Sequence, residues 1–214
     1  VDRLAGSGYQ VVPAEVDVSD ADSIKSLAAL AATELPSVDS WVNNAVEYVF
    51  GGLFDIEDSE WDLSMATNLR GVFICCREAG RVMASAGKGG VVVNVTSTEA
   101  HRGMPRSSHY IAAKHGVLGL TRTIAIELGR YGVRALTVAP TLIETEGMSE
   151  TLAAMGDEGR KRWSDRLPAA RLGLPDDVAR VILFAVTDMA SMMTGSVLMV
   201  DGGEMVGVNK MRLL

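Results

Sequence analysis

The sequence predicts an α/β fold in which a doubly wound, mostly parallel sheet is flanked by helices. Residues 91–95 and 133–140 are apolar runs rich in β-branched side chains, a composition typical of strands buried on both faces. A long helical pattern over residues 110–128 lies between them, and strands that alternate with helices indicate a parallel sheet. The chain of 214 residues is long enough for one domain with a single core, which we expect to span residues 1–214.

The remaining predicted elements continue this alternation. Further strands are expected at residues 10–16, 38–45 and 194–203. Further helices are expected at residues 23–34 and 60–85. Ser19 or Asp20 could cap the first of these helices, because their short polar side chains accept hydrogen bonds from free backbone N–H groups.

The composition argues against several classes of partner. The chain carries 20 Lys and Arg against 27 Asp and Glu, a net charge of −7, and shows no basic stripe, so we expect no nucleic-acid partner. No apolar run approaches the roughly 18 residues of a membrane span, and residues 1–4 resemble neither a signal peptide nor a transit peptide. The adjacent Cys75 and Cys76 suit buried hydrophobic side chains of an intracellular protein better than a metal or redox site. We therefore expect a cytoplasmic protein with no membrane partner and no metal.

Ser97, Tyr110 and Lys114 form the candidate catalytic group. Ser97 follows the strand at residues 91–95, and ligands of open α/β sheets bind beyond the carboxyl ends of strands. Tyr110 and Lys114 are four residues apart, so on a helix both side chains lie on one face. A lysine ammonium about 4 Å from a phenol, at an effective dielectric of about 20, favours the phenolate by roughly 4 kcal/mol. We therefore expect a lowered pKa for Tyr110, which suits general acid–base catalysis, with Ser97 donating a hydrogen bond to the same substrate oxygen.

This chemistry protonates a carbonyl or deprotonates an alcohol while hydride moves. A Tyr-x-x-x-Lys pair alone is weak evidence, because it also occurs on solvated helix faces. Its surroundings are more specific, since Ser97 precedes Tyr110 by thirteen residues and Gly119-Leu-Thr-Arg, Glu127-Leu, Gly132-Val-Arg and Val138-Ala-Pro follow. Here the chain resembles the short-chain dehydrogenase/reductase family, and the resemblance continues through most of the sequence. It implies a Rossmann-like fold, NAD or NADP as cofactor, and a small-molecule ketone or secondary alcohol as substrate.

The resemblance also implies roles for single residues. Ser97, Tyr110 and Lys114 would be catalytic, and Tyr110 and Lys114 would also contact the cofactor, with Lys114 binding its ribose. Asn68 would be a fourth catalytic residue that helps to position the lysine through a water and so supports a proton relay. The alternative for Asn68 is a local hydrogen bond that bends its helix.

Further cofactor contacts follow from the resemblance. Asp17 and Val18 would lie beside the adenine, although Asp17 could equally be a turn or cap residue. The remaining implied cofactor contacts are Asn44, Ala45, Pro140 and Thr145, of which Thr145 would contact the nicotinamide carboxamide.

Some positions depart from the family pattern. Val46 and Thr141 stand where the family has glycine, and Leu136 stands where it has asparagine. Residues 146–170 correspond to the variable substrate loop of the family, and a loop of that length is usually a lid or a binding segment.

The first part of the family pattern is not found in the sequence. The family begins with a strand, a glycine-rich turn that holds the pyrophosphate, and a second strand. Gly6-Ser-Gly8 is not that turn, because it precedes a predicted strand instead of following one. A strand–helix–strand unit takes about 30 residues, so we expect either a preceding segment of the molecule or a truncated family member. Without such a unit, the strands ending at Glu15 and Asn43 would expose unpaired edges.

The usual family assembly implies a homo-oligomer, a dimer or a tetramer. The helices that begin near Asp62 and Tyr110 would form its four-helix interface. His101 and His109 precede Tyr110 in a predicted loop, and we expect both to be exposed and without an acid–base role. Two other functions stay open: a non-catalytic member that binds a dinucleotide or a partner, and a module that only oligomerises.

Overall fold

The computed structural model describes residues 6–207 and contains one parallel sheet of four strands. The strands are β1 (Ser40–Asn43), β2 (Gly90–Val95), β3 (Val133–Pro140) and β4 (Val197–Val200), and they lie side by side in that order. The register pairs Trp41 with Val92, Val92 with Ala135, and Ala139 with Met199. Since neighbouring strands are parallel, helices must carry the chain back between them.

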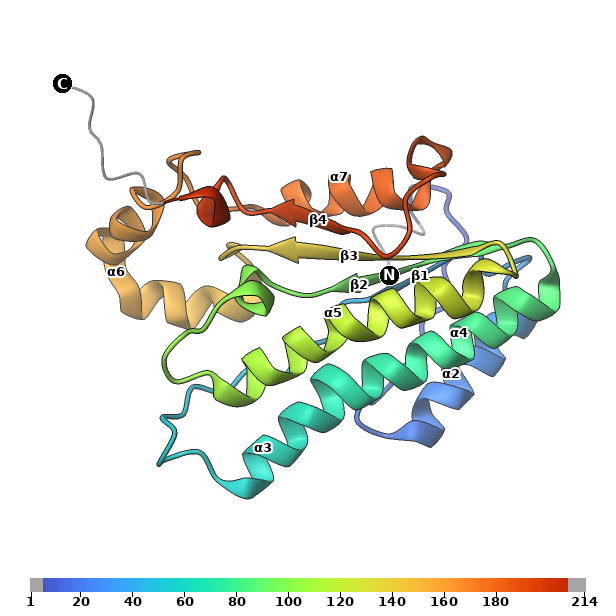
Figure 1. Cartoon of the computed structure of the whole chain (residues 1–214), viewed down its shortest axis with the longest axis horizontal. Helices are drawn as coiled ribbons and strands as arrows, with labels where there is room; N and C mark the ends of the chain where they lie inside the picture. The colour runs from blue at the N-terminus through green and yellow to red at the C-terminus, as the bar shows by residue number, and fades with distance from the viewer. Residues whose placement is uncertain (1–5, 208–214) are drawn as a thin grey trace.

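The helices cover both faces of the sheet (Figure 1). They are α2 (Ala21–Glu34), α3 (Asp58–Met65), α4 (Val72–Ala86), α5 (Ser108–Gly129), α6 (Ser149–Ser164) and α7 (Pro175–Val186). Val92 and Ala135 point to one face and pack in a cluster with Val117 of α5 and Met83 of α4. The neighbouring residues Val91, Val93 and Leu136 point to the other face, where α7 packs with Val178, Ile182 and Ala185. The predicted doubly wound α/β fold is therefore confirmed.

The helix predicted at residues 60–85 is longer than expected and has an irregular centre. It begins with α3 at Asp58, passes through a π-helical turn, η1 (Ala66–Gly71), and ends with α4 at Ala86. Such π-turns widen a helix locally and are frequent at functional sites. Asn68 lies inside this turn.

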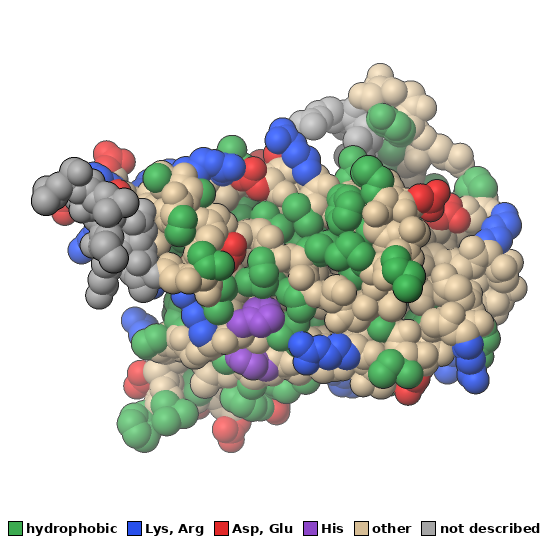
Figure 2. Space-filling view, turned by 45° about the horizontal axis from the view of Figure 1, so that its top comes forward, with side chains coloured by type: hydrophobic (Ala, Val, Ile, Leu, Met, Phe, Trp, Pro, Cys, Tyr) green, Lys and Arg blue, Asp and Glu red, His purple; other side chains and the backbone are tan. Residues whose placement is uncertain are grey.

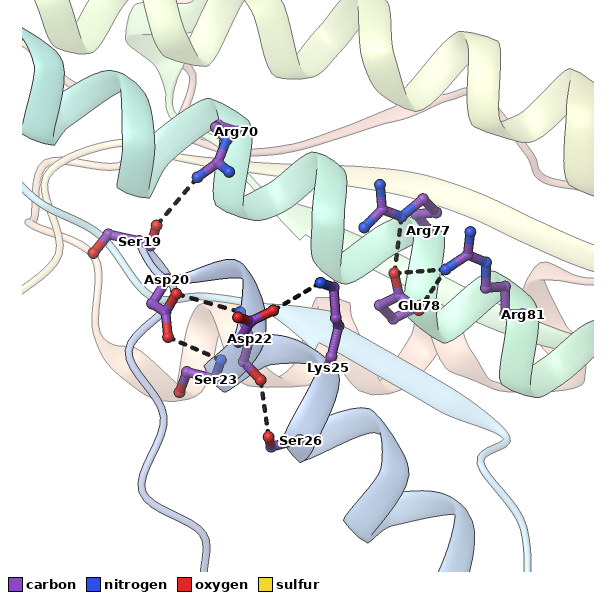
Figure 3. A network of polar contacts seen from close by, with 10 residues as sticks. All are labelled: Ser19, Asp20, Asp22, Ser23, Lys25, Ser26, Arg70, Arg77, Glu78 and Arg81. Carbon is purple, nitrogen blue, oxygen red and sulfur yellow. Dashed lines mark hydrogen bonds and ion pairs between the residues drawn. The ribbon is translucent and has the colours of Figure 1, made fainter.

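Asp20 is the N-cap of α2, as one of the two alternatives predicted. Its carboxylate accepts hydrogen bonds from the backbone N–H groups of Asp22 (3.3 Å) and Ser23 (3.0 Å). Ser19 instead donates its backbone N–H and its hydroxyl to Asp17 Oδ1. Figure 3 shows Asp20, Asp22 and Ser23 together at the start of α2.

The strand predicted at residues 10–16 is wrong, because this segment forms no strand in the structure. A strand needs a neighbour that pairs with its backbone N–H and C=O groups. Within residues 6–207, β1 is the edge of the sheet, and no strand lies beyond it to pair with residues 10–16. Val42 of β1 is 41% exposed, in accordance with the open edge expected for this strand.

The segment at residues 146–170 is not the long loop that the sequence predicted. It contains the short helix η3 (Glu146–Met148) and α6, which is kinked at Gly156. The buried side chains of Leu152, Leu167 and Leu172 form a small core of their own. The segment is therefore packed as a helical unit at the same end of the molecule as the strand tips (Figure 1).

The two cysteines are buried, as predicted. Desolvation raises the pKa of Cys75 to about 11 and that of Cys76 to about 12, so both thiols stay protonated at neutral pH. Among the residues described, no group of three or more His, Cys, Asp or Glu side chains could hold a metal ion. None of the described helices has both the length and the apolar character needed to cross a membrane.

Candidate active site

The candidate catalytic residues lie at the carboxyl end of the sheet. Backbone pairing between β2 and β3 continues to Thr96, whose N–H donates to the Val138 carbonyl at 2.8 Å. Ser97 follows directly, in extended conformation, and a short helix, η2 (Thr98–His101), begins after it. The first turns of α5 lie at the same end of the molecule (Figure 1). Ser97 on the strand tip is thereby brought next to the start of α5, where Tyr110 lies.

Ser97 and Tyr110 meet in this region. Tyr110 is 8% exposed, and a hydrogen bond with the Ser97 side chain lowers its pKa against the effect of burial. Ser97 Oγ accepts the backbone N–H of Glu99 at 3.1 Å. Since this bond uses a lone pair, the hydroxyl hydrogen of Ser97 stays available to a neighbouring oxygen.

Lys114 lies one helical turn after Tyr110 and points inward. It is 3% exposed, and its Nζ donates to the carbonyl of Val95, the last residue of β2, at 3.1 Å. The same Nζ lies 5.5 Å from the centroid of the Tyr110 ring. Burial lowers the pKa of Lys114 to about 8.

The prediction that the pKa of Tyr110 is lowered is wrong, because its pKa is raised in the structure. Desolvation raises the pKa of Tyr110, the hydrogen bond with Ser97 opposes this, and the nearby Glu99 and Tyr48 raise it further. The Lys114 amine donates to the Val95 carbonyl, and the loss of hydration around the phenol is the largest influence on the Tyr110 pKa. Tyr110 is therefore a protonated phenol at neutral pH in this structure.

Asn68 is fully buried and holds the segment that follows β1. Its Nδ2 donates to the Glu47 carbonyl (2.7 Å) and to Ser64 Oγ (3.0 Å), and its Oδ1 accepts the Glu47 N–H (3.0 Å). Both donors of the amide are thus used within the protein. The side chain fixes the backbone at Glu47, and the hydrogen bond of Lys114 goes to Val95 instead of Asn68. The relay role of Asn68 stays a prediction.

Tyr48 is a site residue that the sequence did not reveal. Its ring packs edge-to-face on the Tyr110 ring, with 4.5 Å between centroids, and its hydroxyl lies 3.2 Å from Ser107 Oγ. Phe50 packs on Tyr48 in the same manner at 4.6 Å. The only sequence signal is that these aromatic residues come shortly after the carboxyl end of a strand, where ligands of such sheets bind.

Asp17 and Val18 lie in a tight turn before α2. Asp17 is exposed, and its Oδ1 accepts the N–H and the hydroxyl of Ser19 at 2.8 and 2.7 Å, which lowers the pKa of its carboxyl. This is the turn role that the sequence left open, and it leaves Oδ2 for other partners. Arg70 donates to the Ser19 carbonyl at 3.4 Å (Figure 3). A Cβ at Gly71 would lie 2.2 Å from the Val18 carbonyl oxygen.

The other predicted cofactor contacts lie at the strand tips and just after them. Asn44 and Ala45 are exposed after β1, Pro140 is the last residue of β3, and Thr145 is exposed at the start of η3. Asn43, which precedes them, is not exposed in this way, since its Nδ2 donates to Asn94 Oδ1 at 2.7 Å across the sheet.

The three departures from the family pattern have different surroundings. Leu136 is fully buried in the core under α7, where its apolar side chain needs no partner. Val46 is 53% exposed beyond β1. The Thr141 hydroxyl donates to Glu204 Oε2 at 2.6 Å, which ties the tip of β3 to the segment after β4.

The prediction of exposed histidines is correct for His101 and wrong for His109. His101 is exposed with His115, and Figure 2 shows histidine side chains together on one face of the molecule. His109 is fully buried because α5 already begins at Ser108, so His109 lies in its first turn. Neither ring nitrogen of His109 has a hydrogen-bond partner among residues 6–207.

The side chains at the strand tips suit the nicotinamide end of a dinucleotide. Lys114 is almost fully buried but donates one hydrogen bond within the described residues, so two N–H groups remain for ribose hydroxyls. Asn44 and Thr145 follow parallel strands at the same edge of the sheet and are open to a ligand.

Comparison with known proteins identifies the family. The profile described as Enoyl-(Acyl carrier protein) reductase matches residues 1–204. The chain is 37% identical over 207 residues to an L-rhamnose 1-dehydrogenase (NAD(P)(+)) from Azotobacter vinelandii, covering 97% of this chain and 80% of that protein. The chain belongs to the short-chain dehydrogenase/reductase family.

Solved structures of the family share the fold. A short-chain type dehydrogenase/reductase from Mycobacterium marinum has a TM-score of 0.87 at 30% identity, covering 95% of this chain and 79% of that one. A gluconate 5-dehydrogenase from Burkholderia cenocepacia J2315, in complex with NADP and tartrate, has a TM-score of 0.89 at 27% identity, covering 96% and 80%.

This short-chain dehydrogenase/reductase is therefore an NAD(P)-dependent oxidoreductase. Its reaction is hydride transfer between NAD or NADP and a ketone or secondary alcohol.

Proposed function

We propose that Tyr110 is the general acid and base of this reaction, with Ser97, Lys114 and Asn68 in supporting roles. The observation that carries the proposal is that the Ser97 and Tyr110 side chains meet beside the buried Lys114 amine. A bound nicotinamide would supply or accept the hydride. The proton must then be moved by a protein group within hydrogen-bonding reach of the substrate oxygen.

The protonated phenol suits ketone reduction. As hydride arrives at the carbonyl carbon, Tyr110 donates its proton to the oxygen, and Ser97 donates a hydrogen bond to the same oxygen. In the reverse direction Tyr110 must accept the alcohol proton, which requires the phenolate. The Lys114 ammonium would favour that form, so its charge matters more for alcohol oxidation than for ketone reduction.

The remaining residues would position the reactants. We assign ribose binding to Lys114 with Tyr110 beside it, and contacts near the nicotinamide to Asn44, Ala45, Pro140 and Thr145. We assign the adenine end to Asp17 and Val18. Asn68 would act as a positioning residue, because its side chain fixes Glu47 while its π-helical turn packs against α5.

We also propose a cytoplasmic homo-oligomer, a dimer or a tetramer. Apolar side chains are exposed along the helices that would pair, with Trp61 38%, Leu63 47%, Phe73 44% and Ile126 81% exposed. Covering such side chains with a second copy would remove apolar surface from water. Size-exclusion chromatography with light scattering would measure the assembly.

The variant Tyr110→Phe tests the catalytic proposal, with Tyr131→Phe as control because Tyr131 is 41% exposed beyond α5. We expect Tyr110→Phe to lower kcat by about 1000-fold across a panel of ketones, since a general acid contributes on that order. NAD(P)H fluorescence titration should show that both variants still bind cofactor. Full activity in Tyr110→Phe would contradict the proposal, because another group would then have to move the proton.

A further inference from the structure

Two buried carboxylates lie beside the catalytic residues, and the first, Glu204, has all its partners within the protein. Its side chain is 4% exposed. Its Oε2 accepts hydrogen bonds from the hydroxyls of Thr98 (3.1 Å) and Thr141 (2.6 Å), and its Oε1 accepts a hydrogen bond from the Arg102 guanidinium. Glu204 therefore ties the segment after β4 to the tips of β2 and β3.

The second carboxylate, Glu99, lacks such partners. It is 9% exposed, and its Oε2 is enclosed yet accepts no hydrogen bond from any residue that the structure describes. Burying a carboxylate oxygen without a donor is unfavourable, and such atoms are rare in native proteins. Arg102, which could neutralise Glu99, is bonded to Glu204 instead. The free oxygen of Glu99 therefore needs a donor from outside this part of the chain.

Glu99 lies next to the reacting groups. It is two residues after Ser97, and its N–H donates to the Ser97 hydroxyl oxygen. Its helical turn, η2, packs against α5, which carries Tyr110. Burial is the main cause that raises the pKa of Tyr110 and of Tyr48, and the charge of Glu99 raises both further. The carboxylate is thus close to both phenols.

Resting on the function proposed above, we propose that Glu99 is a substrate-recognition residue whose free oxygen accepts a hydrogen bond from a second hydroxyl of the substrate. The second hydroxyl would lie beside the carbon that gains or loses hydride, because Glu99 is two residues after Ser97 and its N–H donates to the Ser97 hydroxyl oxygen. The substrate class is therefore a polyhydroxylated small molecule, such as a polyol or a sugar derivative, and not a simple alcohol.

The charges nearby favour neither a cationic nor an anionic substrate group at this position. The Glu99 and Glu204 carboxylates are matched by the Lys114 and Arg102 cations, and Arg102 is already paired with Glu204. A neutral hydroxyl donates to the carboxylate without adding charge of either sign.

The test compares butane-2,3-diol with butan-2-ol, which share a carbon skeleton and differ by one hydroxyl. Initial rates of NAD(P)H formation are measured for the full chain and for Glu99→Met, which keeps the side-chain length and removes both oxygens. Glu127→Met is the matched control, since Glu127 is exposed on α5 and the charge change is the same. A second variant, Glu99→Gln, keeps one acceptor oxygen.

We expect the wild-type chain to favour the diol in kcat/KM by about 10- to 100-fold, the usual effect of a hydrogen bond to a charged acceptor. Glu99→Met should lose this preference in the ratio of the two kcat/KM values, because any change in the Tyr110 pKa affects both alcohols alike. Glu99→Gln should retain part of the preference. With reduced cofactor present, which prevents oxidation of the alcohol, the diol should raise the Tm of the wild type and not that of Glu99→Met. Without the diol, Glu99→Met should have a Tm no lower than that of the wild type, which would show that the variant folds.

Equal loss of diol and mono-alcohol turnover in Glu99→Met would overturn the recognition role, because Glu99 would then act on the reaction in general. An unchanged diol preference would overturn it as well. In both cases the proposed oxidoreductase mechanism stands. If the wild type oxidised no alcohol and reduced no ketone of the panel, the proposed function itself would fail, and this inference with it.

Discussion

The two ends of the proposed cofactor site differ in how firmly the rest of the protein holds them. At the catalytic end, Tyr110 is 8% and Lys114 3% exposed, and both are packed between α5 and the tip of β2. At the other end, before α2, Tyr9 is 67% and Val12 37% exposed, and the segment forms no strand. Residues 90–95 and residues 10–16 both contain apolar β-branched side chains, so composition does not explain why only the first segment forms a strand.

The difference shows that a strand depends on its neighbours. Residues 90–95 pair on both sides, with β1 and β3, and their side chains enter two separate cores. Residues 10–16 have no such neighbour within the described chain. The turn at Asp17 follows this segment. It is held by a hydrogen bond from the Ser19 N–H to Asp17 and by contact with η1. The catalytic end is therefore preorganised, whereas the other end depends on a few contacts.

The largest effect that would sharpen this comparison is expected from Lys114→Met. Removing the ammonium should lower kcat by about 1000-fold, the scale of a lost electrostatic or acid–base group. Burial lowers the pKa of Lys114 from 10.5 to about 8, so the charged form destabilises the native state at pH values below 8. At pH 7 the variant should therefore be more stable, by up to about 3 kcal/mol.

The pH dependence of this stability gain has a definite sign. Between pH 8 and 10.5 the unfolded chain binds more protons at Lys114 than the native chain does, so the wild type recovers stability as pH rises. Urea titrations at several pH values measure the free energy of unfolding of both chains. The difference between Lys114→Met and the wild type should shrink over this range, because all other titrating groups contribute equally to both chains. A variant that is less stable at pH 7 would show that the lysine supports the fold and is not a strained functional group.

A smaller effect is expected where the two ends meet, at Gly71. A Cβ there would lie 2.2 Å from the Val18 carbonyl oxygen, so Gly71→Ala must push the turn at Asp17 away from η1. We expect a loss of about 1–3 kcal/mol of stability, as for other overpacked sites. Dinucleotide affinity should fall more than kcat.

Gly119→Ala is the matched control for this variant. Gly119 lies in α5, and a Cβ there would meet no atom within 4 Å. Alanine should therefore stabilise the helix by about 0.5–1 kcal/mol. If both variants changed stability in the same direction, the close approach of Val18 to η1 would not be the cause.

Local sequence rules predicted most of the catalytic end. The four-residue spacing of Tyr110 and Lys114 places them on one helix face, and the carboxyl end of a parallel strand places Ser97 opposite them. The pKa of Tyr110 could not be predicted in this way, because desolvation depends on the packing of Tyr48 and other distant residues.

Other features also depend on tertiary context. The helix at residues 149–164 was missed because its stability comes from a small core with Leu167 and Leu172, which lie outside the helix. The burial of His109 follows from the exact start of α5, and helix boundaries are poorly defined by sequence. The unpaired oxygen of Glu99 also depends on tertiary context, because Arg102 pairs with Glu204, which is far away in the sequence.

The smallest effect is expected at the loosely held end, for Asp20→Ala. This change removes the two N-cap hydrogen bonds of α2 and should cost about 1 kcal/mol, or roughly 2–4 °C in Tm for a chain of this size. Because α2 packs mainly on α4, away from Tyr110 and Lys114, kcat should stay unchanged. Thermal unfolding followed by circular dichroism, together with initial rates, measures both quantities. A fall in kcat similar to that of Lys114→Met would mean that the two ends of the site are coupled far more strongly than the contact at Gly71 allows.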